Sequence, residues 1–401
     1  MWSALQHAKQ AACGFARRHK KLLVVTGVGV ACAGGAYYAY RRMLSEAERF
    51  TQQIQVQMAE HQRLQLALGS TADESRATVR RFLPRLKTRL YQLLDLESVV
   101  QELKTLDKTQ KSKRNELWED AKLLAFTRYL TALVAFGLWH LLVFAQVSII
   151  GKRVFEKSQV ELSERQKQRE KAEEQAHHAF LTSGLEYFLD EAMGKIKIHV
   201  EAVVRENKQL QAWKVSRKAA VRAEELNELL QALFLAVLPS PTAVAAAEKQ
   251  EDSAELQKWR EFLIYPDKQK GQDEHVISLL NDLWDLLESD LFMPALQHSL
   301  GFLCGNAFQD LDDVVYGPSK SEPRIVEDNA AEPPKKPAPP LAKLIPCLQA
   351  EMNKLLLSSG PDSYAAKYSQ GVGEMEAFRN FYEAIFFEQS TQDSYMGSTL
   401  I

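Results

Sequence analysis

Hydrophobic and polar positions follow one another along most of this chain with the period of an α-helix. Apolar residues recur every three or four positions, so each segment would bury one face against a core. The clearest such stripe consists of Val79, Phe82, Leu83, Leu86, Leu90 and Leu93. We therefore predict an all-α protein: one N-terminal transmembrane helix followed by a large elongated helical bundle with a long buried central helix.

Segment 22–40 is the predicted transmembrane helix. It contains nineteen residues without a charged side chain, and as a helix it would span about 28 Å, close to the hydrocarbon thickness of a bilayer. Basic residues flank it on both sides, where lipid headgroups would lie. Those on its N-terminal side are Arg17, Arg18, Lys20 and Lys21. The chain thus divides into a basic segment (1–21), an anchor (22–40) and a helical domain (41–401).

A cleaved signal peptide is the alternative for the same segment, since Ala31-Cys32-Ala33 resembles a cleavage site. The basic region before the apolar run is long for a signal peptide, and so is the run itself. The chain contains no Asn-x-Ser/Thr glycosylation sequence. Its four cysteines have no paired spacing, which suits a reducing compartment. These features favour a retained anchor.

A second apolar run, from Tyr129 to Ile150, contains no ionised side chain. We expect Asn115 to cap the helix that carries it. Hydropathy alone allows two interpretations, a second membrane span or a central helix packed on all sides by protein. His140 and Gln146 favour the central helix, because a protein core can supply hydrogen-bond partners that lipid lacks.

Three connecting segments carry further expectations. Residues 69–71 (Gly-Ser-Thr) are expected to break the helix that leaves the membrane. Segment 152–178 is densely charged and is expected to be a solvated helix or a partly ordered insertion. Segment 316–340 is rich in Pro, Lys and Glu and is predicted to be a disordered loop within the helical domain.

The sequence carries no recognisable catalytic constellation. Phosphate-binding loops, zinc-protease helices and hydrolase nucleophile elbows are all missing. Lys and Arg total 50 against 52 Asp and Glu, for a net charge of −2, so no basic field favours nucleic acid. His177 and His178 are adjacent and would point in different directions on a helix. We therefore expect a protein that is not an enzyme, with no cofactor, no metal and no small-molecule substrate.

Trp118 is the residue that most suggests a binding surface. It follows a basic connector, 103–114, and we place it in the first turn of the central helix. One interpretation is an ordinary core residue at the end of the bundle. The other is a partly exposed aromatic anchor, the residue type that most often dominates binding energy. A groove rimmed by Leu117, Trp118 and the connector would accept an amphipathic helix with acidic flanks.

The chain resembles the peroxin-3 family in ordered landmarks along nearly its whole length. These are Phe82-Leu83-Pro84, Leu117-Trp118-Glu119-Asp120-x-Lys122, Phe126-Thr127-Arg128, Ile149-Ile150-Gly151, Leu279-Leu280-Asn281, Leu287-Glu288-Ser289 and Pro340-Leu341-Ala342-Lys343-x-Ile345-Pro346. The basic run before a single N-terminal span also fits. Each landmark alone is weak, whereas their order is specific.

The resemblance implies a peroxisome biogenesis factor, an integral protein of the peroxisomal membrane whose helical domain faces the cytosol. It implies that the domain docks peroxin-19, the receptor that carries newly made peroxisomal membrane proteins, through an N-terminal amphipathic helix of that receptor. It also implies that residues 129–150 form a buried helix, and that the basic segment serves in targeting. The partner-binding residues it implies are Trp118, Leu117, Leu103, Arg114, Lys113 and Lys343.

Two other functions remain open at this stage. A structural tether or adaptor on the outer mitochondrial membrane would also have a basic, apolar N-terminus followed by a helical domain. A two-span membrane enzyme or transporter would require residues 129–150 to cross the bilayer. A soluble domain beginning near Ser45 would exclude the second of these.

Overall fold

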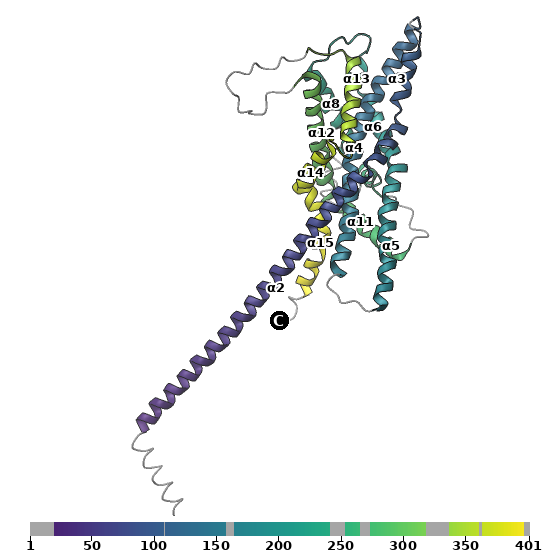
Figure 1. The fold of residues 1–401 in the computed structure, drawn as a ribbon. Coiled ribbons are helices and arrows are strands. Elements are labelled where there is room, and N and C mark those ends of the chain that lie inside the picture. The colour runs from purple at the N-terminus through teal and green to yellow at the C-terminus, as the bar shows by residue number, and fades with distance from the viewer. Residues whose placement is uncertain are drawn as a thin grey trace, which may run out of the picture. The chain divides into compact units, whose positions relative to one another are not determined.

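The computed structural model describes residues 20–107, 109–157, 164–240, 253–264, 273–317, 337–360 and 363–396. The side chains of residues 20–41, 43–48, 53, 164–170 and 388–396 lie outside that description. The described residues form helices without any β-strand, which confirms the predicted all-α class (Figure 1). The helices are α2 (Lys20–Leu93), α3 (Leu96–Thr105), α4 (Lys111–Lys157), α5 (Glu164–Tyr187), the π-helix η1 (Phe188–Ala192), α6 (Met193–Glu206), α7 (Lys208–Ala212), α8 (Ala223–Val237), α10 (Ala254–Arg260), α11 (Glu274–Glu288), α12 (Phe292–Tyr316), α13 (Leu341–Leu355), α14 (Ala365–Glu374) and α15 (Glu376–Met396).

The chain divides into two compact units, residues 1–66 and 67–401. The described part of the first unit, residues 20–66, is helical throughout, because α2 begins at Lys20 and continues into the second unit. The predicted anchor, 22–40, therefore falls on helical backbone, but its side chains lie outside the described residues, as do residues 1–19. The second unit contains the rest of α2 and every later helix.

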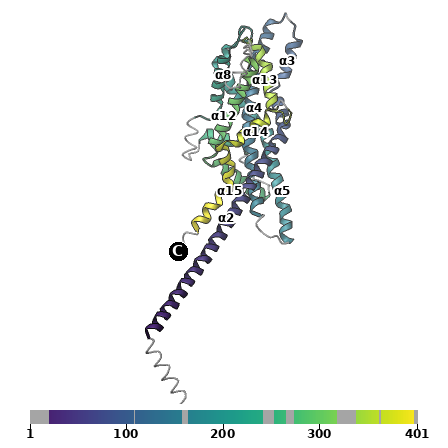
Figure 2. The same ribbon diagram turned by 60° about the vertical axis from the view of Figure 1, so that its left-hand side comes forward.

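Helix α4 is the centre of the second unit. It contacts α3, α5, α6, α11, α12, α13 and α15, and both views place it among the other helices (Figures 1 and 2). Every side chain from Ala125 to Ile149 is buried. Among the described helices, α4 is the one long and apolar enough to cross a membrane, and 94% of its most apolar window is buried inside the protein. The predicted buried central helix is thus confirmed.

Two polar side chains in the middle of α4, those of His140 and Gln146, have hydrogen-bond partners within the protein. The ring nitrogens of His140 lie 2.8 Å from the Phe136 carbonyl oxygen and 2.7 Å from the Ser369 hydroxyl. The side-chain amide of Gln146 donates to the Phe180 carbonyl at 2.9 Å. Burial lowers the pKa of His140 to about 4, although the Phe136 carbonyl acts in the opposite direction. His140 is therefore neutral at physiological pH and compatible with an apolar core.

Two glycines of α4 allow neighbouring helices to approach closely. A Cβ atom on Gly137 would lie 2.6 Å from a methyl carbon of Leu300 on α12. A Cβ atom on Gly151 would lie 2.6 Å from the Thr71 hydroxyl of α2. Both distances are shorter than van der Waals contact, so a larger residue at either position would push the packed helices apart.

The structure corrects two predicted helix boundaries. Residues 69–71 do not break a helix, since α2 continues through them to Leu93. A single glycine costs only about 1 kcal/mol in a helix, and the hydroxyls of Ser70 and Ser75 donate to backbone carbonyls within the helix. Asn115 is not an N-cap, because α4 begins at Lys111. The connector 103–114 therefore consists mostly of the end of α3 and the start of α4.

The remaining two segments fall partly outside the described residues. The charged run 152–178 is divided between the end of α4 and the start of α5, with 158–163 outside the description. Tyr316 ends α12 and residues 337–340 lead into α13, whereas 318–336, most of the expected disordered loop, lie outside it.

Candidate functional site

Trp118 lies on α4 about two helical turns after its start at Lys111, rather than in the first turn as predicted. Both Trp118 and its neighbour Leu117 are partly buried and pack against the hydrophobic core. Trp139, farther along the same helix, is completely buried. The indole of Trp118 therefore keeps apolar area that a partner could cover.

The other residues predicted for this site lie on α3, α4 and α13. Lys113 is exposed, and its Nζ lies 3.0 Å from Glu102 Oε1, so an ion pair joins α4 to α3. Arg114 is partly buried, and Lys343 is exposed in the first turn of α13. Leu103 is only 6% exposed and belongs to the core. Figure 1 shows α3 and the start of α13 at the same end of the second unit.

A buried lysine lies one helical turn beyond Trp118. Lys122 is completely buried, and its Nζ donates to Glu119 Oε2 at 2.7 Å and to the carbonyl oxygens of Leu210 at 3.0 Å and Trp213 at 2.8 Å. An ammonium group has three N–H donors, so all of them are used. This arrangement, which we call the Lys122 clip, removes most of the cost of burying the charge.

The clip holds a non-helical segment, residues 213–221, which contains a turn at 215–217 and which we call the strap. Glu119 Oε1 accepts the Val215 N–H at 2.8 Å. At its other end the strap pairs with the residues before and at the start of α13. The Val221 N–H donates to the Pro339 carbonyl at 2.9 Å, and the Leu341 N–H donates to the Lys218 carbonyl at 3.2 Å. The strap therefore joins α4, beside Trp118, to the helix that carries Lys343.

Glu119 is kept ionised by the clip. Partial burial pushes the pKa of its carboxyl upward, but the hydrogen bonds from Lys122 and from the Val215 N–H outweigh this effect. The pKa of Glu119 is therefore below its usual value, so the carboxylate stays charged at neutral pH and keeps both partners. The sequence predicted no binding or positioning role for Glu119 or Lys122. Their spacing of three residues was the available signal, whereas the carbonyl partners lie about ninety residues away.

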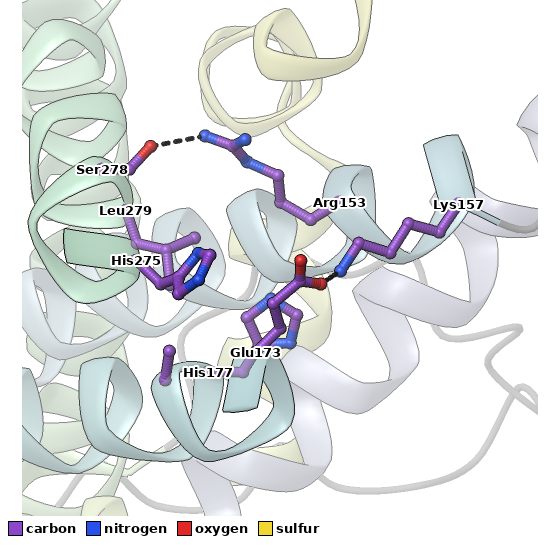
Figure 3. Close-up of a pocket in the computed structure, with 8 residues that line it drawn as sticks. Arg153, Lys157, Glu173, His177, His275, Ser278 and Leu279 are labelled. Atoms are coloured by element: carbon purple, nitrogen blue, oxygen red, sulfur yellow. Dashed lines mark hydrogen bonds and ion pairs between the residues drawn. The ribbon is translucent and has the colours of Figure 1, made fainter. Parts of the chain in front are cut away.

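A second polar site lies between α4, α5 and α11 (Figure 3). It is a cavity of about 70 Å³ lined by Arg153, Lys157, Glu173, Ala176, His177, His275, Ser278 and Leu279. Arg153 pairs with Asp282 at 2.6 Å and also donates to the Ser278 hydroxyl, and Lys157 pairs with Glu173. Each of these two cations thus has a carboxylate partner, which leaves little net charge to attract an ion.

The surroundings of this cavity favour the neutral form of His177. Burial lowers the pKa of His177, and the positive charges of Lys157 and Arg153 lower it further. Within the ranges that the structure describes, no group of three His, Cys, Asp or Glu side chains is placed to share a metal ion. We therefore regard the end of the unit around Trp118 as the candidate functional site.

Comparisons with known proteins point to one family. Residues 104–209 match the family model described as Peroxin-3. Peroxisomal biogenesis factor 3 of Bos taurus is 29% identical over 141 residues, the Rattus norvegicus protein 30% over 145 residues and the Homo sapiens protein 28% over 141 residues. Each match covers 35% of this chain and 36% of the relative, so the chain matches little more than a third of the relatives' length. The matched block, which contains Trp118, Glu119 and Lys122, is thus similar to the peroxin-3 family.

Proposed function

From its similarity to the peroxin-3 family, we propose that this chain is a peroxisome biogenesis factor that acts by binding, without catalysis. In this proposal the anchor, 22–40, holds the protein in the peroxisomal membrane as a single span. The helical domain, 41–401, faces the cytosol and docks the import receptor peroxin-19, which carries newly made peroxisomal membrane proteins. Docking would bring this cargo to the bilayer for insertion.

The partly buried Trp118 carries the proposal. It lies within the matched segment, and its indole packs against the hydrophobic core on one side. A tryptophan held in this way loses little conformational freedom when a partner covers it, which is why such residues dominate many interfaces. An amphipathic receptor helix could place its apolar face on Trp118 and Leu117.

The basic residues near Trp118 suit a receptor helix with acidic flanks. Lys113 and Lys343 are exposed, and Arg114 is partly exposed. Charges at the rim of an interface contribute less to affinity than buried anchors do, but they select the partner and accelerate association. Leu103 would support the groove from within the core, because it offers little exposed surface itself.

Two experiments test the proposal. The full-length protein in lipid nanodiscs, titrated calorimetrically with a peptide of the peroxin-19 N-terminal helix, should bind it with a stoichiometry of about one. Absence of binding by the folded protein would contradict the docking function. In cells, a reporter fused to residues 1–50 should colocalise with a peroxisomal marker; a purely mitochondrial pattern would contradict the proposed location.

A further inference from the structure

We propose that the strap, 213–221, is a second wall of the partner-binding surface, in which Lys214 and Arg217 contact acidic side chains of the docked helix. We propose further that Lys122 is the positioning residue that holds this wall in place. The inference rests on the proposed docking function and extends it. It assigns a role to a segment that lies about a hundred residues away from Trp118 in sequence.

The strap crosses α4 within one helical turn of Trp118. Glu119, the next residue along α4, accepts the Val215 N–H, and Lys122 binds the Trp213 carbonyl. Side chains on this part of the strap therefore lie close enough to Trp118 for one bound helix to touch both. The hydrogen bonds of Lys218 and Val221 to residues 339–341 continue the same surface to Lys343.

Two of the strap's cations remain available to a partner. The Lys214 side chain is 50% exposed, and its Nζ lies 3.9 Å from Glu119 Oε2, which Lys122 already binds at 2.7 Å. Arg217 is exposed, and no ion pair of its side chain is found within the described part of the chain. Lys218 differs from both, because it pairs with Glu225 at 2.9 Å and lies over the Trp213 ring.

The neighbouring carboxylates do not neutralise this surface. Glu119 is occupied by the clip, and Glu225 by Lys218 and Arg222. Asp120 lines a separate cavity with Glu201 and Arg205 of α6. Exposed basic side chains thus lie on the strap and at the start of α13, and the strap's hydrogen bonds join both to α4 next to Trp118. This pattern complements an amphipathic helix that has an apolar stripe between acidic flanks.

The primary test reverses both strap charges in the full-length protein. The double variant Lys214→Glu/Arg217→Glu, in nanodiscs and titrated with the same receptor peptide, should bind about tenfold more weakly at low salt. The difference should shrink at high salt, since exposed charges are screened. The matched control is Arg80→Glu/Lys171→Glu, which makes the same charge change at exposed positions on α2 and α5 and should leave affinity unchanged. Equal losses in both double variants, or no loss in the first, would overturn the inference.

A second test separates positioning from simple stability. In Lys122→Met the strap amides, including that of Val215, should exchange with solvent faster while the middle of α4 stays protected. The strap charge reversal should then cost much less affinity in the Lys122→Met background than in the wild type. Equal costs in the two backgrounds would overturn the role of Lys122. If Lys122→Met fails to fold, Glu119→Gln serves instead, because it weakens the bond to Lys122 and keeps an acceptor for Val215.

The outcomes distinguish the inference from the function on which it rests. Wild-type protein that does not bind the peptide would remove the docking proposal altogether. Wild-type binding that Trp118→Ala abolishes, with no effect from the strap variants, would keep the docking site and remove only the strap.

Discussion

The middle and the N-terminal end of α4 belong to one continuous helix, yet they use polar groups in opposite ways. In the middle, His140 and Gln146 are buried and neutral, and they bond to the carbonyls of Phe136 and Phe180 and to the Ser369 hydroxyl. At the end, Lys122 is buried as a cation and binds a distant segment, beside a tryptophan that is only partly covered. The middle packs as a core on all sides, and the end is where we propose a binding surface.

The largest expected effect concerns stability in the middle of α4. Trp139 is completely buried, and its ring lies 5.2 Å from that of Phe188 between centroids. Trp139→Ala should lower the free energy of unfolding by about 3–5 kcal/mol, because it removes a large side chain and leaves a cavity. Denaturant unfolding followed by circular dichroism in detergent measures this change. A loss below about 1 kcal/mol would contradict the tight packing of the central helix.

The pH dependence of stability should also come from the middle. His140 has a pKa of about 4 in the folded protein against about 6.5 when unfolded, so the unfolded chain binds the proton more readily. The contribution of neutral His140 to the free energy of unfolding is therefore fully present above pH 6.5. It is lost as the pH falls towards 4, and the loss is up to about 3 kcal/mol. Unfolding free energies between pH 7 and pH 5 measure the slope. His140→Gln should have a smaller slope than the wild type, and an unchanged slope would show that other groups cause it.

Breaking the clip should cost less stability than opening the core. Lys122→Met removes charge-assisted hydrogen bonds to Glu119 and to two carbonyl groups. We expect a loss of about 2 kcal/mol in the free energy of unfolding, since Glu119 is partly exposed and water can reach it. Lys171→Met, at an exposed position on α5, is the control and should change stability by less than about 0.5 kcal/mol.

The smallest effect is expected at the rim of the candidate site. Lys113 and Glu102 form an ion pair whose side chains are 54% and 45% exposed. Lys113→Ala should therefore change stability by no more than about 0.5 kcal/mol. Its effect on peptide association should be a slower on-rate at low salt, measurable by stopped-flow fluorescence. A stability loss above about 1 kcal/mol would show that this pair is more than a surface contact.

The difference between the two parts of α4 also explains what the sequence could reveal. The middle was predictable, because an uncharged run that contains His140 and Gln146 fits a protein core better than lipid. The Trp118 end was predictable only in part. Trp118 and the basic residues near it could be named, but the strap could not, since its contact with Lys122 joins residues about ninety positions apart. No local pattern records such a pairing.

Helix boundaries were the weakest part of the prediction, for the same physical reason. Gly69, Ser70 and Asn115 have local preferences for breaks and caps that are worth about 1 kcal/mol each. At residues 69–71 tertiary packing exceeds the local preference, because Thr71 packs against Gly151 of α4. The helical spacing of apolar residues was the more dependable signal for the buried faces, because it combines the burial of many residues.

We expect Trp118 to serve binding rather than stability, and a matched pair of tryptophan variants distinguishes these two roles. Trp284 is also partly buried against the core, on α11. Calorimetric titration of the nanodisc-embedded protein with the receptor peptide should show a loss of at least ~2 kcal/mol of binding free energy in Trp118→Ala, and none in Trp284→Ala. Retained affinity in Trp118→Ala, or an equal loss in both folded variants, would contradict the account.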